Sequence, residues 1–238
     1  MFTMKKLRVD VWSDIACPWC YVGKRRLEAA LARFRGRDSV EVVWRAFELD
    51  PSSPRERDTS VSNAERLAQK YGTSRQQAEA MLARMTDTAK GDGLDFHFER
   101  QRSGNTFDAH RLLHLAAERG VQDAVKERFL RGYMTDGEAI GNPDALVRMA
   151  AEAGLPEEET RKVLATDAYA AEVREDEAQA QELGISGVPF FVIGGRYGLS
   201  GAQPAEVILE ALNRAWKDLA PTAADAAQGA VCGPEGCA

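Results

Sequence analysis

The sequence predicts an α/β protein in which a βαβ unit and a later ββα unit flank a large helical insertion. Strand-like stretches near both ends of the chain and helical periodicity between Ser62 and Leu183 carry this prediction. With 238 residues, 44% hydrophobic and 29% charged, the chain can bury a full core. The expected parts are 1–58 and 185–218 for the two pieces of the α/β fold, 59–184 for the helical insertion domain, and 219–238 for a flexible tail.

The first strand and the first helix meet at Cys17-Pro18-Trp19-Cys20. Residues 7–12 alternate between apolar and polar, which is the period of a half-buried strand. From Pro18 onward the period becomes helical, and the apolar side chains of this helix are Tyr21, Leu27, Leu31 and Phe34. The two cysteines are therefore expected where a strand ends and a helix begins.

A second strand is expected over residues 40–47, which are rich in β-branched and aromatic side chains. The strand, helix, strand order at this spacing predicts a parallel pair. Residues 49–58 carry two prolines and many charges, so the chain is expected to leave the sheet there.

The middle of the chain is expected to form five to seven helices. Two capping boxes mark helix starts, Ser62 with Glu65 and Ser74 with Gln77. A third start is expected at Asn142, because a proline follows it at the first helical position.

Residues typical of β-strands follow the helical insertion. Residues 190–193 are apolar, and Gly194-Gly195 is typical of a tight hairpin that leads into residues 196–199. A final helix is expected from Pro204, and its predicted buried face consists of Val207, Ile208, Leu212 and Trp216. The complete order is that of a thioredoxin fold interrupted in its middle.

The place of the dicysteine at a helix start suggests that one of its thiols is a nucleophile. Pro18 suits the first helical position, which puts Cys17 at or beside the N-cap. Since the helix dipole favours an anion there, Cys17 is expected to ionise more readily than an ordinary cysteine, whose pKa is about 8.5. Cys17 is then the nucleophile and Cys20 the resolving thiol. The alternatives are half of a zinc site or two core cysteines.

The chain resembles the DsbA family of thiol–disulfide oxidoreductases, and within it the FrnE-like cytoplasmic branch. The resemblance covers about residues 7–216 and rests on residues 14–23 (DIACPWCYVG), Asn105-Thr106, Ala109-His110-Arg111 and residues 187–190 (GVPF). The family's periplasmic members usually have histidine where this chain has Trp19.

The resemblance implies Cys17 as the attacking thiol, Cys20 as the resolving thiol, and Pro189 as a cis-proline opposite them. It also implies substrate contacts at Pro18, Trp19 and Val188, protein thiols and disulfides as substrates, and no prosthetic group.

Two other functional classes stay open. Kappa-type glutathione transferases and hydroxychromene carboxylate isomerases have a related scaffold, but typically have serine where Cys17 stands. A redox-regulated chaperone or metal-binding protein would use the thiols as a switch. His110 and His114 share one helix face, which two zinc ligands can use, but we expect a packing or hydrogen-bonding role and no metal site.

Composition bounds the partners. The net charge of −6 and the pI of about 5.3 point to neither nucleic acid nor an anionic membrane. The N-terminus lacks an apolar run of signal-peptide length, so the expected location is the cytoplasm. The expected partners are protein substrates, with glutathione or a thioredoxin-type protein as a source of electrons.

A second cysteine pair closes the sequence. Cys232 and Cys237 are separated by four residues that include Gly233, Pro234 and Gly236, which favour a turn. We expect an auxiliary redox pair that exchanges disulfides with Cys17 and Cys20 or with an external thiol. An inert tail and a four-thiolate zinc site are the alternatives.

Overall fold

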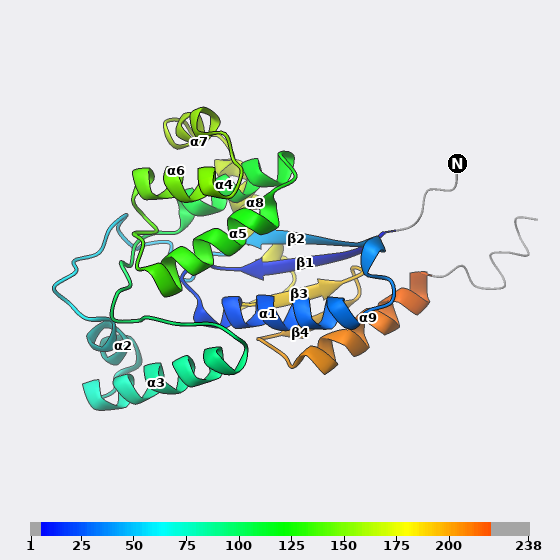
Figure 1. The fold of residues 1–238 in the computed structure, drawn as a ribbon, viewed down its shortest axis with the longest axis horizontal. Coiled ribbons are helices and arrows are strands. Elements are labelled where there is room, and N and C mark those ends of the chain that lie inside the picture. The colour runs from blue at the N-terminus through cyan, green and yellow to red at the C-terminus, as the bar shows by residue number, and fades with distance from the viewer. Residues whose placement is uncertain (1–5, 220–238) are drawn as a thin grey trace, which may run out of the picture.

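The computed structural model describes residues 6–219 and has a four-stranded sheet at its centre (Figure 1). The strand order is β2-β1-β3-β4. The strands are β1 (Leu7–Ser13), β2 (Val40–Ala46), β3 (Phe190–Ile193) and β4 (Tyr197–Ser200). β1 runs parallel to β2 and antiparallel to β3, so the strand that leads into the dicysteine is an inner strand. The predicted parallel pair and the predicted hairpin are both confirmed.

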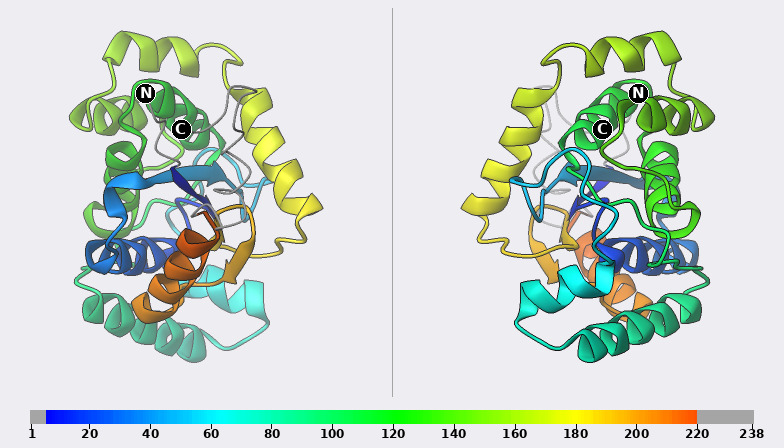
Figure 2. Two further views of the ribbon diagram at one scale, coloured as in Figure 1. Left: turned by 90° about the vertical axis from the view of Figure 1, so that its right-hand side faces the viewer. Right: turned by 90° about the vertical axis from the view of Figure 1, so that its left-hand side faces the viewer.

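Helices cover both faces of this sheet. Helices α1 (Pro18–Arg33) and α9 (Ala205–Leu219) pack against one face and share a core with β1 and β3. Helix α8 (Ala170–Glu182) lies on the other side, where Ala180 packs with Trp12 (Figure 2). The result is the DsbA-like thioredoxin fold that the sequence predicts.

The helices between β2 and β3 form most of the remaining structure. They are α2 (Asn63–Tyr71), α3 (Arg75–Gly91), α4 (Phe107–Glu118), α5 (Gln122–Arg131), α6 (Pro143–Glu152), α7 (Glu157–Leu164) and α8. Both predicted capping boxes are present, and the Asn142 side chain accepts a hydrogen bond from the Ala145 N–H. A π-helical turn, Gly132–Asp136, follows α5. Helices α2 and α3 lie apart from α4–α7 (Figure 1).

The prediction for the buried face of α9 is wrong at one position. Ile208, Ala211, Leu212 and Ala215 form the buried stripe, whereas Val207 is 37% exposed. Buried positions at i, i+3, i+4 and i+7 leave Val207 outside the stripe.

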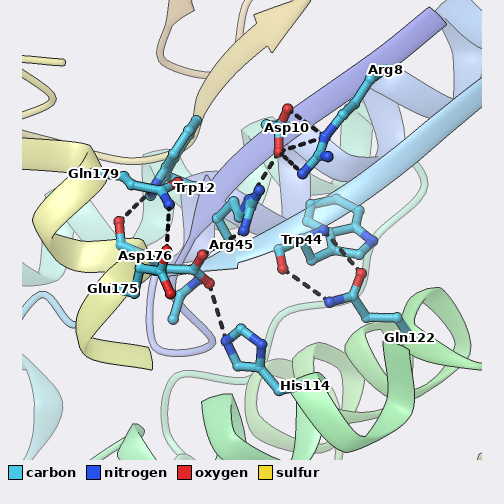
Figure 3. Close-up of polar contacts among 11 residues, drawn as sticks. Arg8, Asp10, Trp12, Trp44, Arg45, His114, Gln122, Glu175, Asp176 and Gln179 are labelled. Carbon is cyan, nitrogen blue, oxygen red and sulfur yellow. Dashed lines mark hydrogen bonds and ion pairs between the residues drawn. The ribbon is translucent and has the colours of Figure 1, made fainter. Parts of the chain in front are cut away.

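Asp176 of α8 fastens the helical segment to the sheet (Figure 3). It is buried and accepts hydrogen bonds from Arg45 Nη1 at 2.7 Å and from the Ala46 N–H at 2.9 Å. His114 Nε2 on α4 lies 3.1 Å from Oδ2, the oxygen that also accepts the Ala46 N–H. Burial alone would raise the pKa of Asp176. His114, the Ala46 N–H and Arg45 together lower it by more, so the pKa of Asp176 lies below the ordinary value.

None of the described helices is long and apolar enough to cross a membrane.

Candidate active site

The two cysteines lie at the junction between β1 and α1, as the sequence predicts. Cys17 occupies the N-cap with extended backbone, φ −93° and ψ 114°, and Pro18 is the first helical residue. Both thiols are free. Both residues are buried, Cys17 with 5% of its surface exposed at the N-cap and Cys20 with none one turn further along the helix.

The Val188–Pro189 segment lies against Cys17. Cys17 Sγ donates a hydrogen bond to the Val188 carbonyl at 3.5 Å, and the Val188–Pro189 bond is cis. Gly23 allows this approach, because a Cβ at that position would lie 2.8 Å from Pro189 Cγ. The structure therefore brings together three residues that the sequence analysis singled out from distant parts of the chain: Cys17, Val188 and Pro189.

The surroundings of Cys20 favour a negative charge. Burial raises the pKa of the Cys20 thiol, but the hydrogen bond with Cys17, the positive charge of Lys126 and the Ser13 hydroxyl lower it below the ordinary value. Lys126 reaches this position from α5, and its Nζ donates to the Ser13 carbonyl at 3.1 Å.

The predicted ready ionisation of Cys17 stays a prediction, because its thiol and that of Cys20 share a hydrogen bond and titrate as a pair. Its hydrogen bond to Cys20, its burial and the negative charge of Cys20 raise the pKa of Cys17 well above the ordinary value. The helix N-terminus favours an anion at Cys17, but it competes with a buried ammonium near Cys20. The reduced pair thus holds one proton between two sulfurs, and their places in the helix, Cys17 at the N-cap and Cys20 one turn further along, distinguish their roles.

Asp14 and His110 form a second buried polar group beside the cysteines. Asp14 Oδ2 accepts a hydrogen bond from the Leu49 N–H at 2.8 Å, and His110 Nε2 lies 3.4 Å from Oδ1. Burial raises the pKa of Asp14, but His110 and the Leu49 N–H outweigh it, so the pKa lies below its ordinary value. Asp14 also accepts the Cys17 N–H through its backbone carbonyl at 3.4 Å. Since Asp14 Oδ1 also accepts the Ala16 N–H at 3.3 Å, Asp14 fixes the turn that presents Cys17 through both its carboxylate and its backbone carbonyl.

The two histidines of α4 do not converge on one site. His110 faces Asp14, whereas His114 faces Asp176. Among residues 6–219 no group of three or more metal-ligating side chains could hold an ion. The two histidines thus each lie beside a buried carboxylate, and the two carboxylates are on different elements of the fold.

A cavity of about 540 Å³ opens beside the dicysteine. Ala16 and Pro18 form the wall nearest the cysteines, and the cations Arg57, Arg66 and Lys70 line other parts. Outside the cavity, Trp19 is 45% exposed next to Cys17. The chain segment around Cys17 therefore borders a cavity with three cations through Ala16 and Pro18 and is followed by an exposed apolar residue, Trp19.

Lys126 is the functional candidate that the sequence analysis missed. The apolar stripe of α5 and the turn after it contains Phe129, Leu130 and Tyr133, and Lys126 lies on the same face. A lysine at a buried position of a helix stripe is a signal that the sequence contains. The group that it contacts, the Ser13 carbonyl at the end of β1, depends on the tertiary structure and is not visible in the sequence.

Comparison with known proteins agrees with this geometry. Residues 8–213 match the model of the DSBA-like thioredoxin domain family. The crystal structure of the probable DsbA oxidoreductase SCO1869 from Streptomyces coelicolor has a TM-score of 0.84 and 48% identity, with 98% of each chain covered. The uncharacterized protein YwbO of Bacillus subtilis strain 168 is 28% identical over 209 residues, which are 87% of this chain and 96% of YwbO.

A more distant structure shares the fold. The cytosolic disulfide reductase DsbM from Pseudomonas aeruginosa, in its structure with GSH, has a TM-score of 0.60 and 17% identity, with 90% of this chain and 97% of DsbM covered. The matches to the family model and to SCO1869 identify the relationship at the level of sequence. The chain belongs to the DSBA-like thioredoxin domain family of thiol–disulfide oxidoreductases.

Proposed function

We propose that this protein exchanges disulfides with protein substrates through Cys17 and Cys20. The observation that carries the proposal is the arrangement of two neighbouring free thiols, with Cys17 at the N-cap of α1 against Val188 and Cys20 one turn deeper in the helix. The outer sulfur can form a mixed disulfide with a partner, and the inner sulfur beside it can resolve that bond.

The exchange proceeds in two steps. A substrate thiolate attacks Cys17 Sγ of the Cys17–Cys20 disulfide, which breaks the S–S bond and leaves a thiolate on Cys20. A second substrate thiolate then attacks the substrate sulfur of the mixed disulfide and releases Cys17. The substrate loses two electrons and gains a disulfide, while the protein becomes a dithiol. The reverse sequence reduces a substrate disulfide, and the reduction potential of the pair sets the direction.

The surface around Cys17 suits an extended polypeptide. The half-buried Val188 lies directly against Cys17, so its backbone lies within reach of a peptide whose cysteine is attacked. Backbone pairing of this kind needs little side-chain specificity. Pro18 and the exposed Trp19 add apolar contact on the helix side. We infer a broad range of protein substrates.

The cavity beside Pro18 supports glutathione as an electron partner, with a thioredoxin-type protein as the alternative. Glutathione carries two carboxylates, and Arg57, Arg66 and Lys70 line the cavity. Within the same cavity Asp50 pairs with Arg57, which leaves Arg66 and Lys70 for a ligand carboxylate. Replacing Arg66 and Lys70 with Gln should raise the glutathione concentration needed for half-maximal turnover while turnover driven by dithiothreitol stays unchanged. An equal loss with both reductants would contradict this role.

The experiment that tests the proposed function compares the two cysteine variants on reduced and on disulfide-bonded insulin. Cys17→Ser should abolish exchange, whereas Cys20→Ser should accumulate a mixed disulfide that mass spectrometry detects. Retained turnover in Cys17→Ser would overturn the assignment. A glutathione-dependent isomerase is the second candidate, because the cavity suits an anionic thiol. It predicts turnover of a hydroxychromene carboxylate with glutathione and none of insulin.

The predicted auxiliary pair, Cys232 and Cys237, lies outside the described residues and remains part of the proposal. Replacing both cysteines with Ser should slow turnover when the external reductant is limiting. Single-turnover chemistry at Cys17 should stay intact. Equal turnover of the variant and the wild type at every reductant concentration would contradict the auxiliary role.

A further inference from the structure

Lys126 is a buried cation without a carboxylate partner among the described residues. Its side chain is completely buried, and its one hydrogen bond goes to the Ser13 carbonyl. An ammonium group has three donors, and burial of a charge is costly unless an opposite charge compensates it. The position of Lys126 therefore requires a negative group nearby.

Lys24 is a second buried lysine beside Trp44, and carboxylates compensate its charge. Both ammonium groups lie over the Trp44 ring, Lys126 Nζ at 5.6 Å and Lys24 Nζ at 5.9 Å from its centroid. Lys24, also buried, forms ion pairs with Asp123 and Glu127 at 3.2 Å each and with Glu28. The two lysines thus share one ring, but only Lys24 has its carboxylates.

The negative groups that face Lys126 are Asp14 and the two thiols. Asp14 is already held by the N–H groups of Leu49 and Ala16 and lies beside His110. The thiol pair is the remaining site where a negative charge can form. Cys20 is the sulfur on which Lys126 has the larger effect.

We propose that Lys126 is a positioning residue that stabilises the thiolate of the reduced Cys17–Cys20 pair and thereby makes the pair a stronger oxidant. This inference rests on the proposed function and adds the group that sets its redox balance. The helical segment, through α5, then controls chemistry that takes place on the thioredoxin-like part of the chain.

The redox step shows why the charge matters. When a substrate dithiol reduces the Cys17–Cys20 disulfide, the protein takes up two electrons. It keeps one proton, shared by its two sulfurs, and the other substrate proton goes to solvent. The disulfide carries no charge, whereas the reduced pair carries one negative charge beside Lys126. An ammonium there lowers the free energy of the reduced form only, which raises the reduction potential.

The charged groups around Lys126 make a pH dependence expected. They are Asp14 and Cys17 at the turn between β1 and α1, and Cys20 and Lys24 on α1. His110 on α4 acts through Asp14. Trp44 on β2 also contacts Lys126 but is uncharged. Burial lowers the pKa of Lys126 to about 8, although Cys20, Asp14 and Cys17 oppose that shift. The oxidising strength of the pair should therefore decrease as the pH rises through 8 and Lys126 loses its proton.

The test compares Lys126→Met with the matched variant Lys24→Met in the full chain. Each variant is equilibrated with glutathione redox buffers, and thiolate formation is followed by ultraviolet absorbance against pH. Lys126→Met should lower the equilibrium constant for reduction by glutathione at least tenfold, which is about 30 mV, and should raise the pH of thiolate formation. Lys24→Met should change both quantities less than Lys126→Met does, because the charge of Lys24 is already compensated by Glu28, Asp123 and Glu127. Lys126→Arg should restore most of the effect.

Equal potentials and equal thiolate titrations in Lys126→Met and the wild type would overturn the inference. The proposed function would still stand, because it fails only if the wild type forms no reversible Cys17–Cys20 disulfide. If Lys126→Met does not fold, a measurement on the wild type can test the inference instead. Nuclear magnetic resonance titration of the lysine ε-carbons should give a higher pKa for Lys126 in the dithiol form than in the disulfide form, and identical values would also overturn the inference.

Discussion

The thioredoxin-like part and the helical segment contribute different groups to the site. β1, α1 and the loop before β3 supply the groups that react or lie against the reacting sulfur, Cys17, Cys20 and Val188. Helices α4 and α5 supply the buried polar groups behind them, His110 and Lys126. The comparison indicates that the common fold presents the sulfurs, while the inserted helices adjust their charge.

The largest expected effect is a loss of stability when the contact between the helical segment and the sheet is removed. Asp176→Ala removes the buried carboxylate that receives Arg45, His114 and the Ala46 N–H. Loss of one partner in a buried ion pair costs about 3 kcal/mol or more. Urea denaturation should show this loss, while Asp144→Ala, at an exposed partner of Arg161, should change stability by less than about 1 kcal/mol. Similar losses for both variants would contradict the attachment role.

A second change tests the contact between the two cysteine-facing segments. Gly23→Ala places a methyl group 2.8 Å from Pro189 Cγ and 3.3 Å from the Phe191 ring. Overpacking of this kind costs about 1–3 kcal/mol and should displace Pro189 from Cys17. Insulin turnover should fall more than stability alone explains. Gly91→Ala is the control, because its Cβ would meet no atom within 4 Å.

Acid should weaken the attachment through the same carboxylate. The pKa of Asp176 is lowered in the folded state, so its stabilisation is complete above the unfolded value of about 3.9 and is lost as the pH falls through the lower folded value. The free energy of unfolding should decrease as the pH falls below about 4. Asp176→Asn should show a shallower decrease, and equal slopes would exclude Asp176 as a source of the pH dependence.

The smallest expected effect concerns the N-cap of α2, the helix that carries Arg66 and Lys70 of the cavity. Ser62→Ala removes the side-chain acceptor for the Glu65 N–H at the start of α2. The loss of such a cap costs about 1 kcal/mol. The thermal midpoint should fall slightly while the thiolate titration stays the same. A shifted titration would mean that α2 influences the cysteines and would weaken the division of roles between the two regions.

Local signals made the fold predictable to a large extent. Pro18 after Cys17, the Ser62 and Ser74 capping boxes, and Gly194-Gly195 each depend on neighbouring residues, so the sequence contains the full cause. The charge distribution in the site was not predictable in this way. The ionisation of Cys17 was inferred from its own helix alone, but Lys126, more than a hundred residues away in sequence, adds a positive charge that lowers the pKa of Cys20.

The most direct test of the central claim is the alkylation of the two reduced thiols, followed by mass spectrometry at several pH values. Cys17 should react first at every pH, because it lies at the N-cap and keeps 5% of its surface accessible, whereas Cys20 has none. The rate should rise with the thiolate of the pair at a pH below that of an ordinary cysteine, since Lys126 and the hydrogen bond between the sulfurs favour one negative charge. Preferential alkylation of Cys20, or a rate at Cys17 equal to that of a model thiol at neutral pH, would contradict the account.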